Sequence, residues 1–168
     1  SPCPQRQSPA DLWGGRTCGG PLGPAIPLHG GRLFKITPQV TGGGNFYGWA
    51  EGIRGGWVGP LWVDQKGIDP SLLFDDDGTV YYQGTHFDEN GQQCIGQFTL
   101  DIGTGKRLTE TRPIWYGTGD KCPEGPHMYK INGQYYLMIA EGGTEYGHSE
   151  TIARSDNPWG PFESCPRN

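Results

Sequence analysis

Two acidic residues stand beside prolines at matching places in the sequence, each just before an apolar hairpin. Asp69 lies directly before Pro70, and Glu124 lies two residues before Pro126. On residue type alone, an acid in this setting is more often a turn or cap residue. Recurrence at the same place favours a shared role, because two carboxylates facing one cavity are the minimum equipment for acid–base cleavage of a glycosidic bond.

The two acids belong to a repeat that positions them. Three segments each consist of an apolar stretch, a tight turn and a second apolar stretch: residues 24–34, 69–82 and 124–137. The turn glycines Gly31, Gly78 and Gly133 are roughly 50 residues apart, which leaves room for about four short strands per unit. Asp77-Gly78 and Asn132-Gly133 are typical of two-residue hairpin turns, whose central positions both need a positive φ.

Composition supports an all-β fold. The chain has 30 Gly, 15 Pro, 6 Trp, 8 Tyr and 6 Phe among 168 residues, which favours strands and turns over helices. Further strands are expected at residues 45–50, 57–63, 94–100 and 151–155, and no segment has a helical period. We predict a single partial β-propeller domain over residues 1–168, with about three blades at 20–66, 67–122 and 123–168. A β-sandwich with regular hairpins is the alternative.

A propeller would explain how distant acids meet. The first strand of each blade lines the central channel, and equivalent positions of successive blades converge at one end of it. Asp69 and Glu124 would then share one cavity.

Charge and hydropathy exclude several other classes. The net charge of −5 leaves no basic surface for nucleic acid, and no run of about 18 apolar residues predicts a membrane span. No signal peptide is visible, and the compartment, extracellular or cytoplasmic, stays open. The five cysteines are scattered and lack a zinc-binding spacing, so no metal site is predicted from them, and at most two internal disulfides are possible.

Other polar and aromatic residues are weaker candidates. The acidic run 75–77 lacks the alternating spacing of a calcium loop and is expected to be a solvated hairpin tip. His127 is either a channel residue or a packed one. His148 could line the pocket or hold a water or ion near the axis, and an ordinary loop histidine is equally compatible with its context. Phe46 could stack on a sugar face, with core packing as the default.

Three long motifs resemble a known family of enzymes. They are GIDPSLLFDDDGTVYY (67–82), GQFTLDIGTGKRLTETRPIW (96–115) and EGPHMYKINGQYYLMIAEGGTEYGHSETIARS (124–155). They resemble glycoside hydrolase family 43, the five-bladed propeller β-xylosidases and α-L-arabinofuranosidases, over about residue 45 to the C-terminus. The resemblance implies hydrolysis of xylan- or arabinoxylan-type oligosaccharides with inversion and no required cofactor. The choice between xylose and arabinose stays open.

The same resemblance implies roles for individual residues. Glu124 matches the general acid that protonates the leaving oxygen, and Asp69 matches the third acid, which adjusts the pKa of that acid and orients it. His148 matches a histidine near the propeller axis, where some members hold a structural calcium or sodium ion.

The sequence also departs from the family pattern. The general base of the family is an aspartate in a motif like HPDPS, which we do not find here, and Leu22-Gly23-Pro24 stands where WAP is usual. A fifth blade with a substrate-binding arginine would follow residue 168. We therefore expect weak or no turnover from this chain alone, and self-association or a need for the missing blades. The alternative is a non-catalytic carbohydrate-binding fragment.

Overall fold

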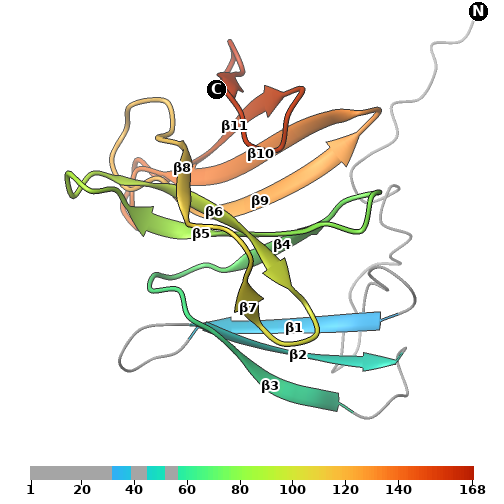
Figure 1. Cartoon of the computed structure of the whole chain (residues 1–168). Coiled ribbons are helices and arrows are strands. Elements are labelled where there is room, and N and C mark those ends of the chain that lie inside the picture. Colours follow the sequence, from blue (N-terminus) through green and yellow to red (C-terminus); the bar gives the residue numbers. More distant parts are fainter. Residues whose placement is uncertain (1–31, 39–44, 52–56) are drawn as a thin grey trace, which may run out of the picture. The chain divides into compact units, whose positions relative to one another are not determined.

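The computed structural model describes residues 32–38, 45–51 and 57–168, and side chains from Leu61 onward (Figure 1). Every regular element in these ranges is a strand, which confirms the all-β prediction for the described residues. The described part of the chain includes no helix long and apolar enough to cross a membrane. The blade boundaries, the number of blades and the closure of a propeller stay predictions.

The chain divides into two compact units, one made of Ser1–Phe34 and Trp49–Val58, the other of Lys35–Gly48 and Gly59–Asn168. The first strands, β1 (Arg32–Pro38), β2 (Asn45–Glu51) and β3 (Trp57–Val63), form a three-stranded sheet in chain order. Strands β4 to β12 all belong to the second unit, within residues 59–168.

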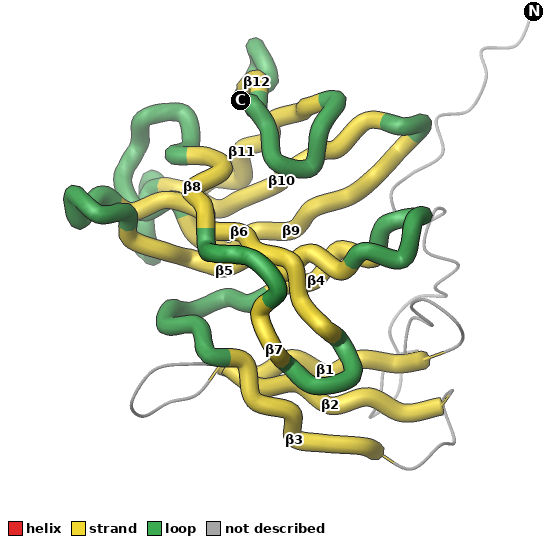
Figure 2. Tube along the Cα trace, in the orientation of Figure 1, coloured by secondary structure: helices red, strands yellow, loops and turns green. Residues whose placement is uncertain are grey.

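Two antiparallel sheets make up this region (Figure 2). In the first sheet β4, β5 and β6 lie in chain order, and both β7 and β8 pair with β6. In the second sheet the order is β12-β11-β10-β9. The bounds are β4 Ser71–Phe74, β5 Val80–Phe87, β6 Gln93–Asp101, β7 Lys106–Arg107, β8 Arg112–Trp115, β9 Glu124–Ile131, β10 Gln134–Glu141, β11 Ser149–Ser155 and β12 Glu163–Ser164.

The two sheets share one hydrophobic core, because strand β9 packs against β4 and β5. Buried residues of both sheets form a single cluster: Leu73, Tyr81, Ile95, Ile114 and Trp115 from the first, and Met128, Tyr135, Leu137, Ile139 and Ala153 from the second. Burial of each large apolar side chain stabilises the folded state by roughly 1.5 to 3 kcal/mol. Strand β10 alternates strictly between buried and half-buried residues, so one of its faces belongs entirely to this core.

The two predicted hairpin turns differ. Asn132 and Gly133 both have positive φ, 52° and 80°, and Ile131 pairs directly with Gln134, as a two-residue turn requires. The other connection is longer and runs from Phe74 to Val80. There the amide of Gly78 bonds to the carbonyl of Asp75, and of the two residues Asp77 and Gly78 only the glycine has positive φ. The two-residue prediction is therefore correct at Asn132-Gly133 and wrong at Asp77-Gly78.

Candidate active site

Asp69 lies in the turn that leads into β4 and is solvent-exposed. Its φ of 55° is in the left-handed region, which Asp tolerates better than most residues. The turn is clamped onto β5, since the amide of Thr85 donates to the carbonyl of Ile68 at 3.1 Å. A Cβ at Gly67 would lie 2.1 Å from the carbonyl oxygen of Thr85, so only glycine permits this approach. These contacts fix the backbone at Asp69 beside β5.

Glu124 is the first residue of β9, is half-buried and pairs with Ala140 of β10. The next amide along the chain, Gly125 N–H, donates to Asp69 Oδ2 at 3.2 Å. Thr85 Oγ1 donates to the same carboxylate oxygen at 3.5 Å. The fold therefore brings the Asp69 carboxylate against the peptide that follows Glu124, although the two acids come from separate hairpins.

The loop between β8 and β9 leads directly into Glu124, the first residue of β9. It is tied to the side chain of Glu141, the last residue of β10, which has 0% exposure. The Thr118 amide bonds to both Glu141 oxygens at 3.0 Å, and the Thr118 hydroxyl donates to Oε2 at 3.0 Å. The hydroxyl of Thr151 donates to Oε2 as well, at 2.6 Å.

Glu141 was not among the residues predicted from the sequence to belong to the site. A usable signal was present, because strand alternation puts residue 141 on the same face as Tyr135, Leu137 and Ile139. An acid at the end of a core-facing row needs hydrogen-bond donors around it, and this need marks it for attention.

The histidine and aromatic candidates are less closely tied to the acids. His127 lies on β9, three residues after Glu124, and is exposed. The hydrogen bonds of His148 stay within its own loop. Its Nδ1 lies 2.6 Å from the carbonyl oxygen of Gly143, and its backbone amide donates to the carbonyl oxygen of Glu145. Phe46 lies in β2, where side chains are outside the described residues.

The opposite end of the β9–β10 hairpin has a different charged cluster. Asp75, only 4% exposed, bonds to Lys130 Nζ and accepts a hydrogen bond from the hydroxyl of Tyr135 at 2.5 Å. Burial acts to raise the pKa of Asp75, but the hydrogen bonds from Lys130 and Tyr135 prevail and lower it. Hydrogen bonds to Asp75 and Asp76 raise the pKa of Lys130.

This cluster corrects one expectation. The acidic run 75–77 was expected to be a solvated hairpin tip, and this is wrong for Asp75. Asp76 and Asp77 are exposed, but Asp75 is buried against Lys130 and Tyr135 of the neighbouring sheet. Its partners are 55 and 60 residues away, so local sequence context could not reveal them.

Neither metal binding nor disulfides appear in the described side chains. No group of three or more His, Cys, Asp or Glu among them could hold a metal ion. These residues alone do not build an axial ion site, which stays a prediction. The thiols of Cys94, Cys122 and Cys165 are free, and burial raises the pKa of Cys94 to about 11.

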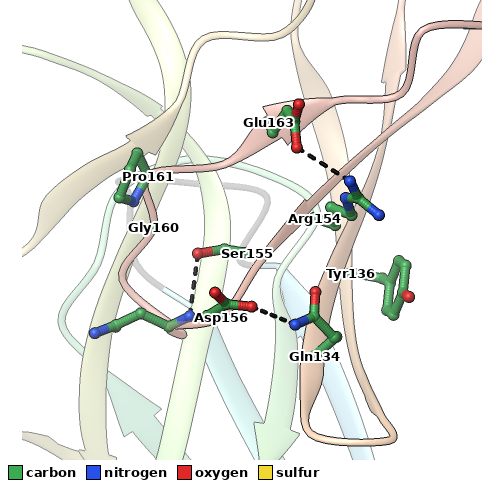
Figure 3. A pocket seen from close by; sticks show the side chains of 9 residues that line it. Gln134, Tyr136, Arg154, Ser155, Asp156, Gly160, Pro161 and Glu163 are labelled. Atoms are coloured by element: carbon green, nitrogen blue, oxygen red, sulfur yellow. Dashed lines mark hydrogen bonds and ion pairs between the residues drawn. The ribbon is translucent and has the colours of Figure 1, made fainter.

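A hollow of about 570 Å³ lies at the turn end of β10, the end away from Glu141 (Figure 3). Its polar side chains pair with one another: Arg154 with Glu163 at 3.3 Å, and Gln134 with Asp156. It is thus separate from the region of Asp69 and Glu124.

Comparison with known proteins identifies the family. The model of glycosyl hydrolases family 43 matches residues 6–168. The chain is 40% identical over 159 residues to the xylosidase/arabinosidase of Butyrivibrio fibrisolvens, covering 89% of this chain and 31% of that protein. It is also 40% identical over 153 residues to a non-reducing end α-L-arabinofuranosidase of Bacteroides ovatus, covering 89% and 28%. The chain spans about a third of the length of these relatives or less.

Solved structures agree with this result. The chain resembles the crystal structure of xylan β-1,4-xylosidase from Bacillus halodurans C-125 with a TM-score of 0.74 and 33% identity, over 84% of this chain and 29% of that one. An exo-1,5-α-L-arabinanase from a bovine ruminal metagenomic library matches with a TM-score of 0.67 over 80% of this chain and 51% of that one. At 17% identity it shares the fold alone.

Proposed function

Since the chain belongs to glycosyl hydrolases family 43, we propose that it carries part of the active site of an inverting glycosidase that acts on xylose- or arabinose-containing oligosaccharides. Glu124 is the general acid in this proposal, and Asp69 is the acid that orients it. The hydrogen bond of 3.2 Å from Gly125 N–H to Asp69 Oδ2 carries the proposal.

The acid half of the reaction follows from these positions. In an inverting glycosidase, one carboxylic acid protonates the leaving oxygen while a carboxylate on the other face of the sugar activates water. Glu124 is half-buried at the start of a strand, so its carboxyl group can meet a substrate without being freely mobile. Asp69 holds the peptide next to Glu124, which limits the positions open to that side chain.

We assign no residue of this chain as the general base. The two carboxyl groups of an inverting pair stand about 6.5 to 9.5 Å apart, with water between them. Asp69 already accepts hydrogen bonds from Gly125 and Thr85, which suits an orienting acid better than a base. We therefore do not give Asp69 the role of base.

The names of the relatives support the substrate class. They include a xylosidase/arabinosidase and an α-L-arabinofuranosidase, so both pentoses are candidates. Among the sugar-contact candidates, exposed His127 is the best supported, because it is on the same strand as Glu124. For His148 the support is weaker, since its Nδ1 is engaged with a carbonyl of its own loop.

The test uses the native polypeptide that contains this sequence, with aryl β-D-xyloside and aryl α-L-arabinofuranoside as substrates. We expect hydrolysis of at least one, and proton NMR of the first-formed sugar should show the inverted anomer. Formation of the retained anomer would contradict the mechanism. Tight binding of xylobiose and arabinobiose with no hydrolysis of either aryl substrate would favour the non-catalytic carbohydrate-binding alternative.

A further inference from the structure

Glu141 is a buried carboxylate that, unlike Asp75, has no cation beside it and that the proposed chemistry does not use. It is completely buried, and none of the ion pairs between described residues includes it. Burying a charge is unfavourable unless partners compensate for it, and here the donors are neutral: an amide and two hydroxyls. Core packing alone therefore does not account for a glutamate at this position.

The partners of Glu141 show what it holds. Two of the three donor groups belong to Thr118, in the loop that leads to Glu124. The loop passes so close that a Cβ at Gly117 would lie 2.3 Å from Glu141 Oε1, and Gly117 has a φ of 78°. Glu141 therefore determines the path of the chain six residues before the proposed acid.

Two further contacts continue this path toward Glu124. The amide of Gly142, next to Glu141, donates to the carbonyl of Lys121 at 2.8 Å. Gln93 Nε2 donates to the carbonyl of Pro123 at 3.3 Å. The loop is thus attached at residues 118, 121 and 123, and two of these attachments depend on the end of β10. On its other side, the pairing of Ala140 with Glu124 joins the same end of β10 to the acid itself.

We propose that Glu141 is a positioning residue for the general acid: through Thr118 it fixes the 117–123 loop, and thereby the place of the Glu124 carboxyl group. This inference rests on the proposed role of Glu124. A displacement of about 1 Å at a reacting group can reduce the rate by about 100-fold. Loss of the Glu141 contacts should therefore weaken proton donation without removing the acid.

The test compares Glu141→Gln with Glu124→Gln in the native polypeptide, on xylobiose and on 2,4-dinitrophenyl β-D-xyloside. If the wild type hydrolyses only arabinosides, arabinobiose and 2,4-dinitrophenyl α-L-arabinofuranoside replace these two substrates. Dinitrophenolate leaves without protonation, whereas a sugar alcohol needs the acid. Gln keeps the shape of the side chain but loses the charge and one acceptor, and the Thr118 amide cannot reverse its direction to compensate. We expect kcat of Glu141→Gln to fall about 10- to 100-fold on xylobiose, with little change in KM, and at most about 3-fold on the dinitrophenyl substrate.

Tyr135→Phe is the matched control. Tyr135 lies on the same strand and the same face as Glu141, at the end away from Glu124, and the substitution removes its hydrogen bond to the buried carboxylate of Asp75. We expect it to change both rates little and equally. Equal losses on the two substrates in Glu141→Gln would overturn the positioning role, because they would indicate general structural damage.

Two further outcomes separate the inference from the function on which it rests. If Glu124→Gln also lacks selectivity between the substrates, the proposed general acid is wrong. If Glu124→Gln is selective and Glu141→Gln is not, only the positioning role fails. Should Glu141→Gln not fold, Thr118→Val decides: it removes one hydroxyl contact from the loop. We expect kcat of Thr118→Val to fall more on the disaccharide than on the dinitrophenyl substrate, by a smaller factor than in Glu141→Gln. The same fractional change in kcat on both substrates would overturn the proposal.

Discussion

The hairpin of β9 and β10 has two ends with different electrostatics. At its turn end, the buried Asp75 meets the ammonium group of Lys130 and the hydroxyl of Tyr135. At its open end, Asp69 accepts hydrogen bonds from the Gly125 amide and the Thr85 hydroxyl, and Glu141 accepts them from Thr118 and Thr151. The exposed ion pair of Lys121 with Glu145 at this end includes neither of these carboxylates. Asp75 is thus paired with a cation, whereas Asp69 and Glu141 are bonded to neutral donors.

This difference separates stability from function. A carboxylate paired with a cation is held in its ionised form and contributes to a fixed structure. Burying Glu141 among neutral donors costs stability that the rest of the core must offset. Its bonds to Thr118, and those of Asp69 to Gly125, instead hold the chain on both sides of Glu124. We therefore expect substitutions at the open end to change the rate of hydrolysis, and substitutions at the turn end to change the free energy of unfolding.

The largest effect is expected at Glu124. Glu124→Gln keeps the size of a half-buried side chain but cannot donate the proton, so hydrolysis of an unactivated oligosaccharide should fall about 100- to 10,000-fold. The midpoint of thermal unfolding should change little. Rates on xylobiose and the melting curve measure the two effects, and near-normal turnover would show that the open end does not do the proposed chemistry.

Asp69→Asn is expected to have the next largest effect on the rate. Asn tolerates the left-handed backbone and can still accept from Gly125 N–H, so the variant removes mainly the charge. A hydrogen bond to a charged group contributes about 1.5 to 3 kcal/mol and one to a neutral group about 0.5 to 1.5 kcal/mol, so the loss of charge alone corresponds to about a 10-fold loss of rate. The contrast with Asp69→Ala, which removes the acceptor as well, measures the part played by charge. Equal rates for wild type and Asp69→Asn would contradict an orienting role.

At the turn end, Tyr135→Phe should lower stability rather than rate. It removes a hydrogen bond of 2.5 Å to buried Asp75, and the free energy of unfolding should fall by about 1.5 kcal/mol. Urea denaturation measures this change. A large fall in kcat under conditions where the variant remains folded would contradict the division between the two ends.

The smallest effect is a dependence of stability on pH. Because the pKa of Asp75 is lowered in the folded protein, its contribution is present above the unfolded value of roughly 4 and is lost as pH falls through the folded value. Asp75→Asn should therefore be less stable than wild type at neutral pH and should lose less stability between about pH 4 and pH 2. Parallel stability curves for the two proteins would show that Asp75 does not contribute in this way.

Part of this arrangement could be predicted from the sequence. The strands, the positive φ at Asn132-Gly133 and the matching places of Asp69 and Glu124 follow from local patterns of two to ten residues. Such patterns indicate that the acids start equivalent strands. They do not indicate that Asp69 bonds to the amide of Gly125, because this contact depends on how two sheets pack.

The residues that were missed have long-range partners. Asp75 stands in an acidic run that is typical of a solvated tip, and its cation is 55 residues further on. Glu141 ends an apolar strand in a context that resembles an ordinary strand terminus, and its main partner, Thr118, is 23 residues earlier. In both cases burial by another element overrides the local polarity.

The most direct test is a crystal structure of the Glu124→Gln variant of the native polypeptide with bound xylobiose. We predict that the glycosidic oxygen lies within hydrogen-bond distance of the residue 124 amide, about 2.6 to 3.2 Å, with the Asp69 carboxylate still on Gly125 N–H. A disaccharide bound in the hollow beside Tyr136, or with its glycosidic oxygen turned away from residue 124, would contradict the placement of the chemistry at the open end of the hairpin.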